Sequence, residues 1–552
     1  MTTSEIRELS GVPHLFVNGE PINEMAYITY RTECNRYADF RDAGYKLFSV
    51  PIYFAEMGIN EISGIPPFCR GIFDGTTPDF SVADARMREV LDSCPDAMIF
   101  PRINVNLSEA WERAHPDELA HAKFRDNYKF IFSSDLWAKE VCRQLEIYIR
   151  HLEDSDMRDH IVGYQIAAGQ TEEWFPMDPD SGRGRRASEK FKARCAERGL
   201  RGTVEEEYEF LSDIVADRII EVSSLVKRLT SNRVAVGTFY GYTFVHPDRK
   251  RSSHALKKIL ESDCVDFICS PVVYTGQRAP GFDHYNMLPI DSLKAHGKLY
   301  FVENDTRTHL STAPYDIPHY KMPIWFGPEK KKSIEIIKLH FARALTHSHA
   351  MWWFDMWGGW YDDPDYMSLM TRLCEIGKES VGKSQRSSAE LALFIDERAL
   401  LAVDPDKHDL PSAVHRFMVA LGNTATPYDV YLATDIEKAK NYRACIHLLP
   451  TLAEYGSGQN VHTLTVDLTC RIPSTEELCA FIDSARLTKY TDRPAVVYAN
   501  DSFVALHIVE DGEITLTVDG KDTLTDTVTG EKISFPRRVS IGETYLFSRE
   551  NK

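Results

Sequence analysis

Short apolar runs recur through the first two thirds of the chain, and longer stretches with helical spacing separate them. Several of these runs are continuously apolar rather than alternating, which is typical of parallel strands buried on both faces. We expect eight strands, at Met25–Tyr30, Tyr45–Ile52, Ala97–Asn104, Ile161–Ala167, Arg233–Tyr240, Val265–Val273, Lys298–Glu303 and Ala350–Asp355.

The stretches between the strands have helical patterns. Asp135–Leu152 and Val204–Leu229 are the clearest, and in the second Phe210, Ile214 and Ile219 recur at roughly helical spacing. Eight strand–helix alternations up to about residue 385 predict a (β/α)₈ TIM barrel with long loops. A doubly wound open sheet is the alternative architecture.

The pattern changes near residue 385, where a short polar segment, Lys383–Ser388, interrupts it. Glu390–Asp396 then reads as a strand and Ser412–Leu421 as a helix, which predicts a small flavodoxin-like α/β domain. From about Pro494 the chain alternates, with turns at Asp511–Gly512 and Asp519–Gly520. We therefore predict three domains: a catalytic barrel over 1–385, an α/β oligomerisation domain over 386–492 and a C-terminal β-sandwich over 493–552.

Composition and charge exclude some classes of partner and site. The formal net charge of −18 disfavours nucleic acid and anionic membranes as partners, because both need a basic surface. The N-terminus lacks the pattern of a signal peptide, and the sequence contains no apolar run of membrane-spanning length. The eleven cysteines are scattered without a CxxC pair, which favours reduced thiols in the cytoplasm and neither a disulfide framework nor a zinc site.

The main candidates for chemistry are acidic residues at two predicted strand ends. The fourth strand runs into Glu172 and Glu173, and the seventh ends at Glu303. Because active sites of such barrels lie at the carboxyl ends of the strands, these carboxyl groups are expected to face each other across the barrel mouth. Two carboxyl groups about 5–5.5 Å apart cleave a glycosidic bond with retention, one as general acid/base and the other as nucleophile. We assign Glu173 to the first role and Glu303 to the second.

Aromatic and basic residues near the other strand ends fit a carbohydrate site. Four of the eight tryptophans fall between Trp352 and Trp360, and of these Trp353 and Trp357 are predicted to contact substrate. Trp174 is a third such candidate. Tyr274 follows the sixth strand and is placed to hydrogen-bond the nucleophile, and Arg102 on the third strand is placed to keep it ionised. Loops that bind nucleotide phosphates and motifs that bind metal are missing, so no cofactor or metal is expected.

These residues together resemble the clan A glycoside hydrolases, and within them the family 42 β-galactosidases. Three features carry the likeness: the strand-end glutamates, the loop Ser108–Glu118 and the domain order. The loop has a tryptophan followed by Pro-Asp-Glu, which is similar to the tryptophan and Pro-Glu of that family. The resemblance implies a retaining exo-acting β-glycosidase that acts on a neutral glycoside. It also implies a homotrimer built by the middle domain.

The sequence departs from that family at the acid/base position. The family usually has Asn-Glu there, whereas this chain has Thr171-Glu172-Glu173-Trp174. Related barrels with a Gly-x-Thr-x-Glu-Trp pattern favour Glu173 over Glu172. The missing asparagine leaves a β-mannosidase, another β-glycosidase or transglycosylase of the clan, and a catalytically decayed carbohydrate-binding barrel as alternatives.

Overall fold

The computed structural model describes residues 1–56, 70–119, 132–169, 171–175, 185–274, 278–311, 329–449 and 461–549. Its largest unit is a closed barrel of eight parallel strands, which confirms the predicted fold class and excludes the open sheet. Every strand lies within two residues of its predicted bounds. The strands are β4 (Met25–Ile28), β5 (Leu47–Tyr53), β6 (Met98–Asn104), β7 (Gly163–Ala167), β8 (Ala235–Phe239), β9 (Phe267–Pro271), β10 (Leu299–Asn304) and β11 (Ala350–Phe354).

Aromatic rings fill the barrel interior. Phe100, Phe267 and Phe301 contact one another edge to face, with ring centroids 5.4–5.7 Å apart. Gly163 and Gly237 make room for two of these rings, since a Cβ at either position would lie about 2 Å from Phe100 or Phe267. The barrel is therefore a packed core, and only its ends are available for a ligand.

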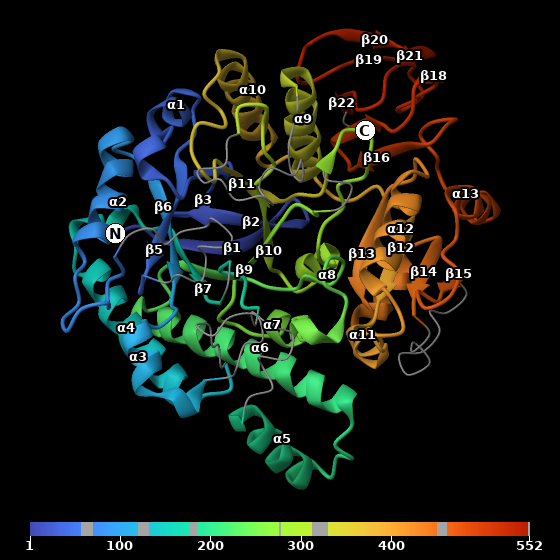
Figure 1. The fold of residues 1–552 in the computed structure, drawn as a ribbon. Helices are drawn as coiled ribbons and strands as arrows, with labels where there is room; N and C mark the ends of the chain where they lie inside the picture. The colour runs from blue at the N-terminus through green and yellow to red at the C-terminus, as the bar shows by residue number, and fades with distance from the viewer. Residues whose placement is uncertain are drawn as a thin grey trace.

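Helices surround the barrel, as Figure 1 shows. The two helices that the sequence analysis singled out are present, at almost the expected bounds. The helices of the barrel are α1 (Tyr37–Asp42), α2 (Ser81–Ser93), α3 (Glu109–Ala114), α4 (Asp135–Glu153), α5 (Arg185–Arg198), α6 (Val204–Leu229), α7 (Leu256–Leu260), α8 (Ile290–Ala295), α9 (Lys330–Thr346) and α10 (Pro364–Ser380).

A small antiparallel sheet precedes the barrel, which the sequence analysis did not predict. Its strands are β1 (Ser4–Leu9), β2 (Val12–Val17) and β3 (Glu20–Pro21). The turns at Ser10–Gly11 and Asn18–Gly19, all at positive φ, carry the signal that would have identified it.

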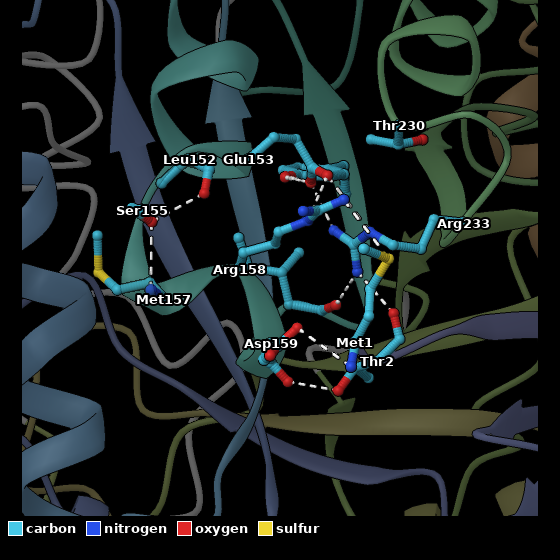
Figure 2. A network of polar contacts seen from close by, with 12 residues as sticks. Met1, Thr2, Leu152, Glu153, Ser155, Met157, Arg158, Asp159, Thr230 and Arg233 are labelled. Atoms are coloured by element: carbon cyan, nitrogen blue, oxygen red, sulfur yellow. Dashed lines mark hydrogen bonds and ion pairs between the residues drawn. The ribbon is translucent and has the colours of Figure 1, made fainter.

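This sheet is fixed to the amino-terminal ends of the barrel strands. The backbone N–H of Ser4 donates to Arg233 O just before β8, at 2.9 Å. In Figure 2 the Arg233 guanidinium joins Glu153 at the end of α4, at 2.5 Å, and donates to Thr2 O at 2.8 Å. The N-terminal segment thus lies at the end of the barrel opposite the carboxyl ends of the strands.

Two smaller parts follow the barrel and appear in orange and red in Figure 1. The first is a parallel sheet in the order β13-β12-β14-β15, and the second consists of antiparallel sheets of three, two and two strands. Helix α8 packs against β13, and α9 packs against β17 and β22. The domain boundaries at 385/386 and 492/493, and a β-sandwich for the last part, stay predictions.

The elements of these parts are β12 (Leu391–Ile395), α11 (Glu397–Ala402), α12 (Leu410–Gly422), β13 (Tyr428–Leu432), β14 (Ala444–Leu448), β15 (His462–Val466), α13 (Thr475–Ser484), β16 (Ala495–Ala499), β17 (Phe503–Ile508), β18 (Gly512–Ile514), β19 (Thr523–Thr525), β20 (Lys532–Ser534), β21 (Arg537–Val539) and β22 (Thr544–Ser548).

Candidate active site

Glu303 lies near the carboxyl end of β10 and points into the barrel. Strand side chains alternate between faces, so Glu303 follows the inward-facing Phe301. Only 5% of Glu303 is exposed. Its Oε2 accepts hydrogen bonds from Arg102 Nη2 at 2.6 Å and from Trp352 Nε1 at 3.2 Å. Both donors bind the same oxygen, which leaves Oε1 without a donor among the described residues.

The ionisation of Glu303 is set by opposing effects. Burial raises its pKa, the positive charge of Arg102 lowers it, and the nearby carboxylates of Asp305 and Glu172 raise it again. The result is a pKa of about 7. Glu303 is therefore a carboxylate that ionises near neutral pH and is held in place by an arginine and an indole.

Glu173 lies in a tight loop directly after β7. The backbone N–H of Trp174 donates to Ala168 O at 2.8 Å, which closes the loop on itself. Gly169, Thr171, Glu172 and Trp174 all have positive φ, a conformation that costs non-glycine residues free energy. Asn106 holds the loop by accepting from Gly169 N at 2.8 Å and donating to Gly169 O at 3.0 Å.

The Glu173 side chain is half-buried and receives a hydrogen bond from the Thr171 hydroxyl. Burial raises its pKa to about 8, and the negative charge of Glu303 contributes to the rise, whereas Thr171 and Tyr242 oppose it. At neutral pH Glu173 is thus mainly protonated.

Glu172 has different surroundings from Glu173, although burial raises the pKa of both. It is fully buried, and its Oε2 accepts from Tyr30 OH at 3.0 Å and lies 3.5 Å from Arg102 Nη1. Arg102, itself fully buried, therefore lies between Glu172 and Glu303. Glu172 is thus enclosed on the far side of Arg102 from Glu303, and Glu173 has the more exposed side chain.

Tyr274 follows β9 and lies among the acidic residues. Burial raises its pKa well above the usual range, and Glu173, Asp305 and Glu303 raise it further. Arg278 lies against its ring, with Cζ 4.8 Å from the centroid. Residues 275–277, which follow Tyr274 in the predicted loop, lie outside the described residues.

The three predicted tryptophans lie in different surroundings. Trp174 is buried, and its indole N–H donates to Ile166 O at 3.2 Å. Trp353 faces the helices, since its indole N–H donates to Tyr45 OH at 3.0 Å and that hydroxyl donates to Met370 O on α10. Trp357 is nearly buried, and the guanidinium of Arg307 lies 4.5 Å from the centroid of its ring. The indole N–H groups of Trp174 and Trp353 therefore donate to acceptors other than Glu303.

Several groups near the glutamates were not predicted from the sequence. Trp352 takes the inward position on β11, where it pairs with Glu303 in the register between β10 and β11. Asp305 forms a buried ion pair with Arg278 at 2.6 Å. Tyr30 and Tyr242 come from loops after β4 and β8, and no local pattern marks them.

We find no group of three or more histidine, cysteine, aspartate or glutamate side chains arranged to hold a metal ion within the described ranges. Within the same ranges, none of the helices has the length and apolarity that crossing a membrane requires.

Comparison with known proteins gives matches at the level of structure. No family model matches the sequence, and no curated protein sequence matches it. A cold-adapted β-galactosidase from Rahnella sp. R3 has a TM-score of 0.63 at 12% identity, over 99% of this chain and 100% of that one. A β-galactosidase from the psychrophilic Marinomonas ef1 has a TM-score of 0.63 at 11% identity, over 95% and 100%.

A catalytic mutant of a GH42 β-galactosidase from G. stearothermophilus has a TM-score of 0.62 at 9% identity, over 96% of this chain and 98% of that one. At such identities the likeness shows the fold alone. Over nearly its whole length the chain therefore shares the fold of these β-galactosidases, one of which is a GH42 enzyme.

Proposed function

We propose that the protein is a retaining exo-acting β-glycosidase of the β-galactosidase type. The observation that carries the proposal is the position of two carboxyl groups, Glu303 on the seventh barrel strand and Glu173 in the loop that follows the fourth. Glu303 is bound by Arg102 and Trp352, and Glu173 has a pKa of about 8, raised by burial and by Glu303. A nucleophile that ionises before the acid does is what double displacement requires.

In the first step Glu303 attacks the anomeric carbon while Glu173 transfers its proton to the leaving oxygen. Arg102 and Trp352 hold the attacking carboxylate at Oε2, which leaves Oε1 for the sugar. In the second step Glu173, now ionised, accepts a proton from water, which hydrolyses the glycosyl–enzyme ester with net retention.

A panel of aryl β- and α-glycosides, assayed at several pH values, tests this function. The proposal predicts turnover of at least one aryl β-glycoside and of no aryl α-glycoside. Binding of a sugar by calorimetry without turnover of any aryl glycoside would favour a carbohydrate-binding barrel instead. Product analysis with an added acceptor sugar separates hydrolysis from transglycosylation, the other chemistry open to this pair of glutamates.

We also propose that the chain acts in the cytoplasm as a homotrimer through its α/β part. The trimer rests on the resemblance to the family 42 enzymes, and the cytoplasmic location rests on the scattered cysteines. Light scattering on the full chain tests the assembly, and a mass of one chain would contradict it.

A further inference from the structure

A small, partly open cavity lies where the barrel meets the two smaller parts. Its walls come from α8, the end of α9, the start of β13 and β16. The cavity has a volume of ≈ 30 Å³, which is room for about two water molecules or one small ion. Asn286, Lys294, Arg343 and Tyr498 are among the residues that line it.

Arg343, in the last turn of α9, is buried without a polar partner. It is 7% exposed, and its guanidinium makes no hydrogen bond or ion pair with any residue that the structure describes. Its Nε is fully enclosed, and its guanidinium lies over the Tyr498 ring, with Cζ 5.5 Å from the centroid. Arginine cannot lose its proton at accessible pH, so the charge stays in the interior.

Other buried arginines of the chain show what such a charge normally has. Arg102 contacts Glu303 at 2.6 Å, Arg278 contacts Asp305 at 2.6 Å, and Arg233 contacts Glu153 at 2.5 Å, the last in Figure 2. Leaving a buried charge unpaired costs several kcal/mol. Arg343 therefore needs a counter-charge that the described side chains do not supply by contact.

The acidic side chains around the cavity already have other donors. Asp283 accepts from Tyr498 OH at 2.5 Å and from Tyr428 OH at 3.2 Å. Asp291 accepts from Lys294 at 2.9 Å and from the backbone N–H of Val430 at 2.7 Å.

Asp429 is likewise occupied, since it accepts from Ser387 at 2.6 Å and from Tyr442 at 2.7 Å. Burial and the charge of Asp291 raise its pKa to about 7, so much of its charge is lost near neutrality. None of the three carboxylates forms an ion pair with Arg343 among the described residues, although the charge of Arg343 lowers the pKa of Asp283 against the effect of burial.

We propose that this cavity binds one small monovalent anion, of carboxylate or halide size, with Arg343 as its counter-ion. The Asn286 amide and the Lys294 ammonium line the same space and supply further donors. Because α8 and α9 of the barrel, β13 and β16 all border the cavity, the bound anion ties the three parts together. This site is independent of the proposed glycosidase activity.

Thermal unfolding of the full chain tests the proposal. Wild type, R343M and the control R143M are dialysed into a buffer with only bulky anions and titrated with sodium formate. Arg143 is an exposed arginine on α4, so R143M makes the same change away from the cavity. We expect formate to raise the midpoint of wild type and R143M by about 2–4 °C and then saturate, and to leave R343M unchanged. Equal responses of wild type and R343M would overturn the proposal.

Crystals of the wild type soaked in sodium bromide give a second readout that does not depend on the folding of R343M. The proposal predicts an anomalous peak within contact distance of the Arg343 guanidinium. Water density alone at that position, with bromide bound elsewhere on the surface, would also overturn it.

Discussion

Arg102 donates from Nη2 to Glu303 at 2.6 Å and directs Nη1 toward Glu172, 3.5 Å away. One buried guanidinium thus serves two buried carboxyl groups. Its charge lowers the pKa of Glu303, while the charge of Glu172 raises it. The ionisation of the proposed nucleophile therefore depends on a balance between these two neighbours.

Replacing Arg102 with methionine should disturb that balance. R102M removes the positive charge, so the pKa of Glu303 rises and the acid limb of the kcat/KM profile moves to higher pH. We expect turnover to fall by about 10²–10³-fold and the free energy of unfolding to fall by about 3–5 kcal/mol. Kinetics over a pH series and denaturant unfolding measure the two effects. An acid limb at the wild-type position in R102M would refute the assigned role.

The wild-type pH profile follows from the two proposed catalytic groups. Activity requires Glu303 ionised and Glu173 protonated, and their pKa values are about 7 and about 8. The rate rises as Glu303 loses its proton and falls as Glu173 loses its own, which gives a narrow bell with its maximum between about pH 7 and 8. Full activity maintained at pH 5 would contradict this order of ionisation.

The roles of Glu172 and Glu173 can be distinguished by making the same substitution, Glu to Gln, at each position. E173Q removes the acid. Cleavage of glycosides whose leaving group needs protonation should therefore slow by about 10²–10⁴-fold, and cleavage of dinitrophenyl glycosides should slow far less. E172Q removes a charge behind Glu303, so it should lower the pKa of Glu303 and move the acid limb to lower pH. Rates across leaving groups of different pKa measure the difference. A steep dependence on the leaving group in E172Q, and none in E173Q, would exchange the two roles.

The loop that carries Glu173 offers a test of backbone geometry. Gly169 has φ +85°, and a Cβ there would lie 3.0 Å from Phe175 O. G169A should cost about 1–2 kcal/mol in unfolding free energy and reduce kcat, because it displaces the acid. G199A is the matched control, since Gly199 has φ +65° with open space around its Cβ position. Equal kcat losses in both variants would show that the geometry of the Glu173 loop does not matter.

Continuous apolar runs were enough to place the barrel strands, because parallel strands buried on both faces leave a strong local signal. The strand ends at Glu173 and Glu303 followed from the same pattern. Local sequence did not reveal which way each side chain points when Trp352 and Trp353 are adjacent. Only Phe301 and the register between β10 and β11 put Trp352 beside Glu303.

Contacts between distant segments were beyond the same reasoning. Tyr30 reaches Glu172 from a loop 142 residues earlier in the chain, and Asn106 holds Gly169 from 63 residues away. Neither residue stands in a motif. Among the described residues no acid forms an ion pair with Arg343. This too arises only in the folded chain, where Tyr428 and Tyr498 donate hydrogen bonds to Asp283.

The product formed by E303A in the presence of azide tests the central claim most directly. Removing the nucleophile should lower hydrolysis of an activated aryl β-glycoside by about 10⁴-fold or more. Azide should then restore turnover by attacking from the side that Glu303 vacates, and NMR should show an α-glycosyl azide. Near-wild-type hydrolysis by E303A, or a β-glycosyl azide as the rescue product, would contradict the assignment of Glu303 as the nucleophile.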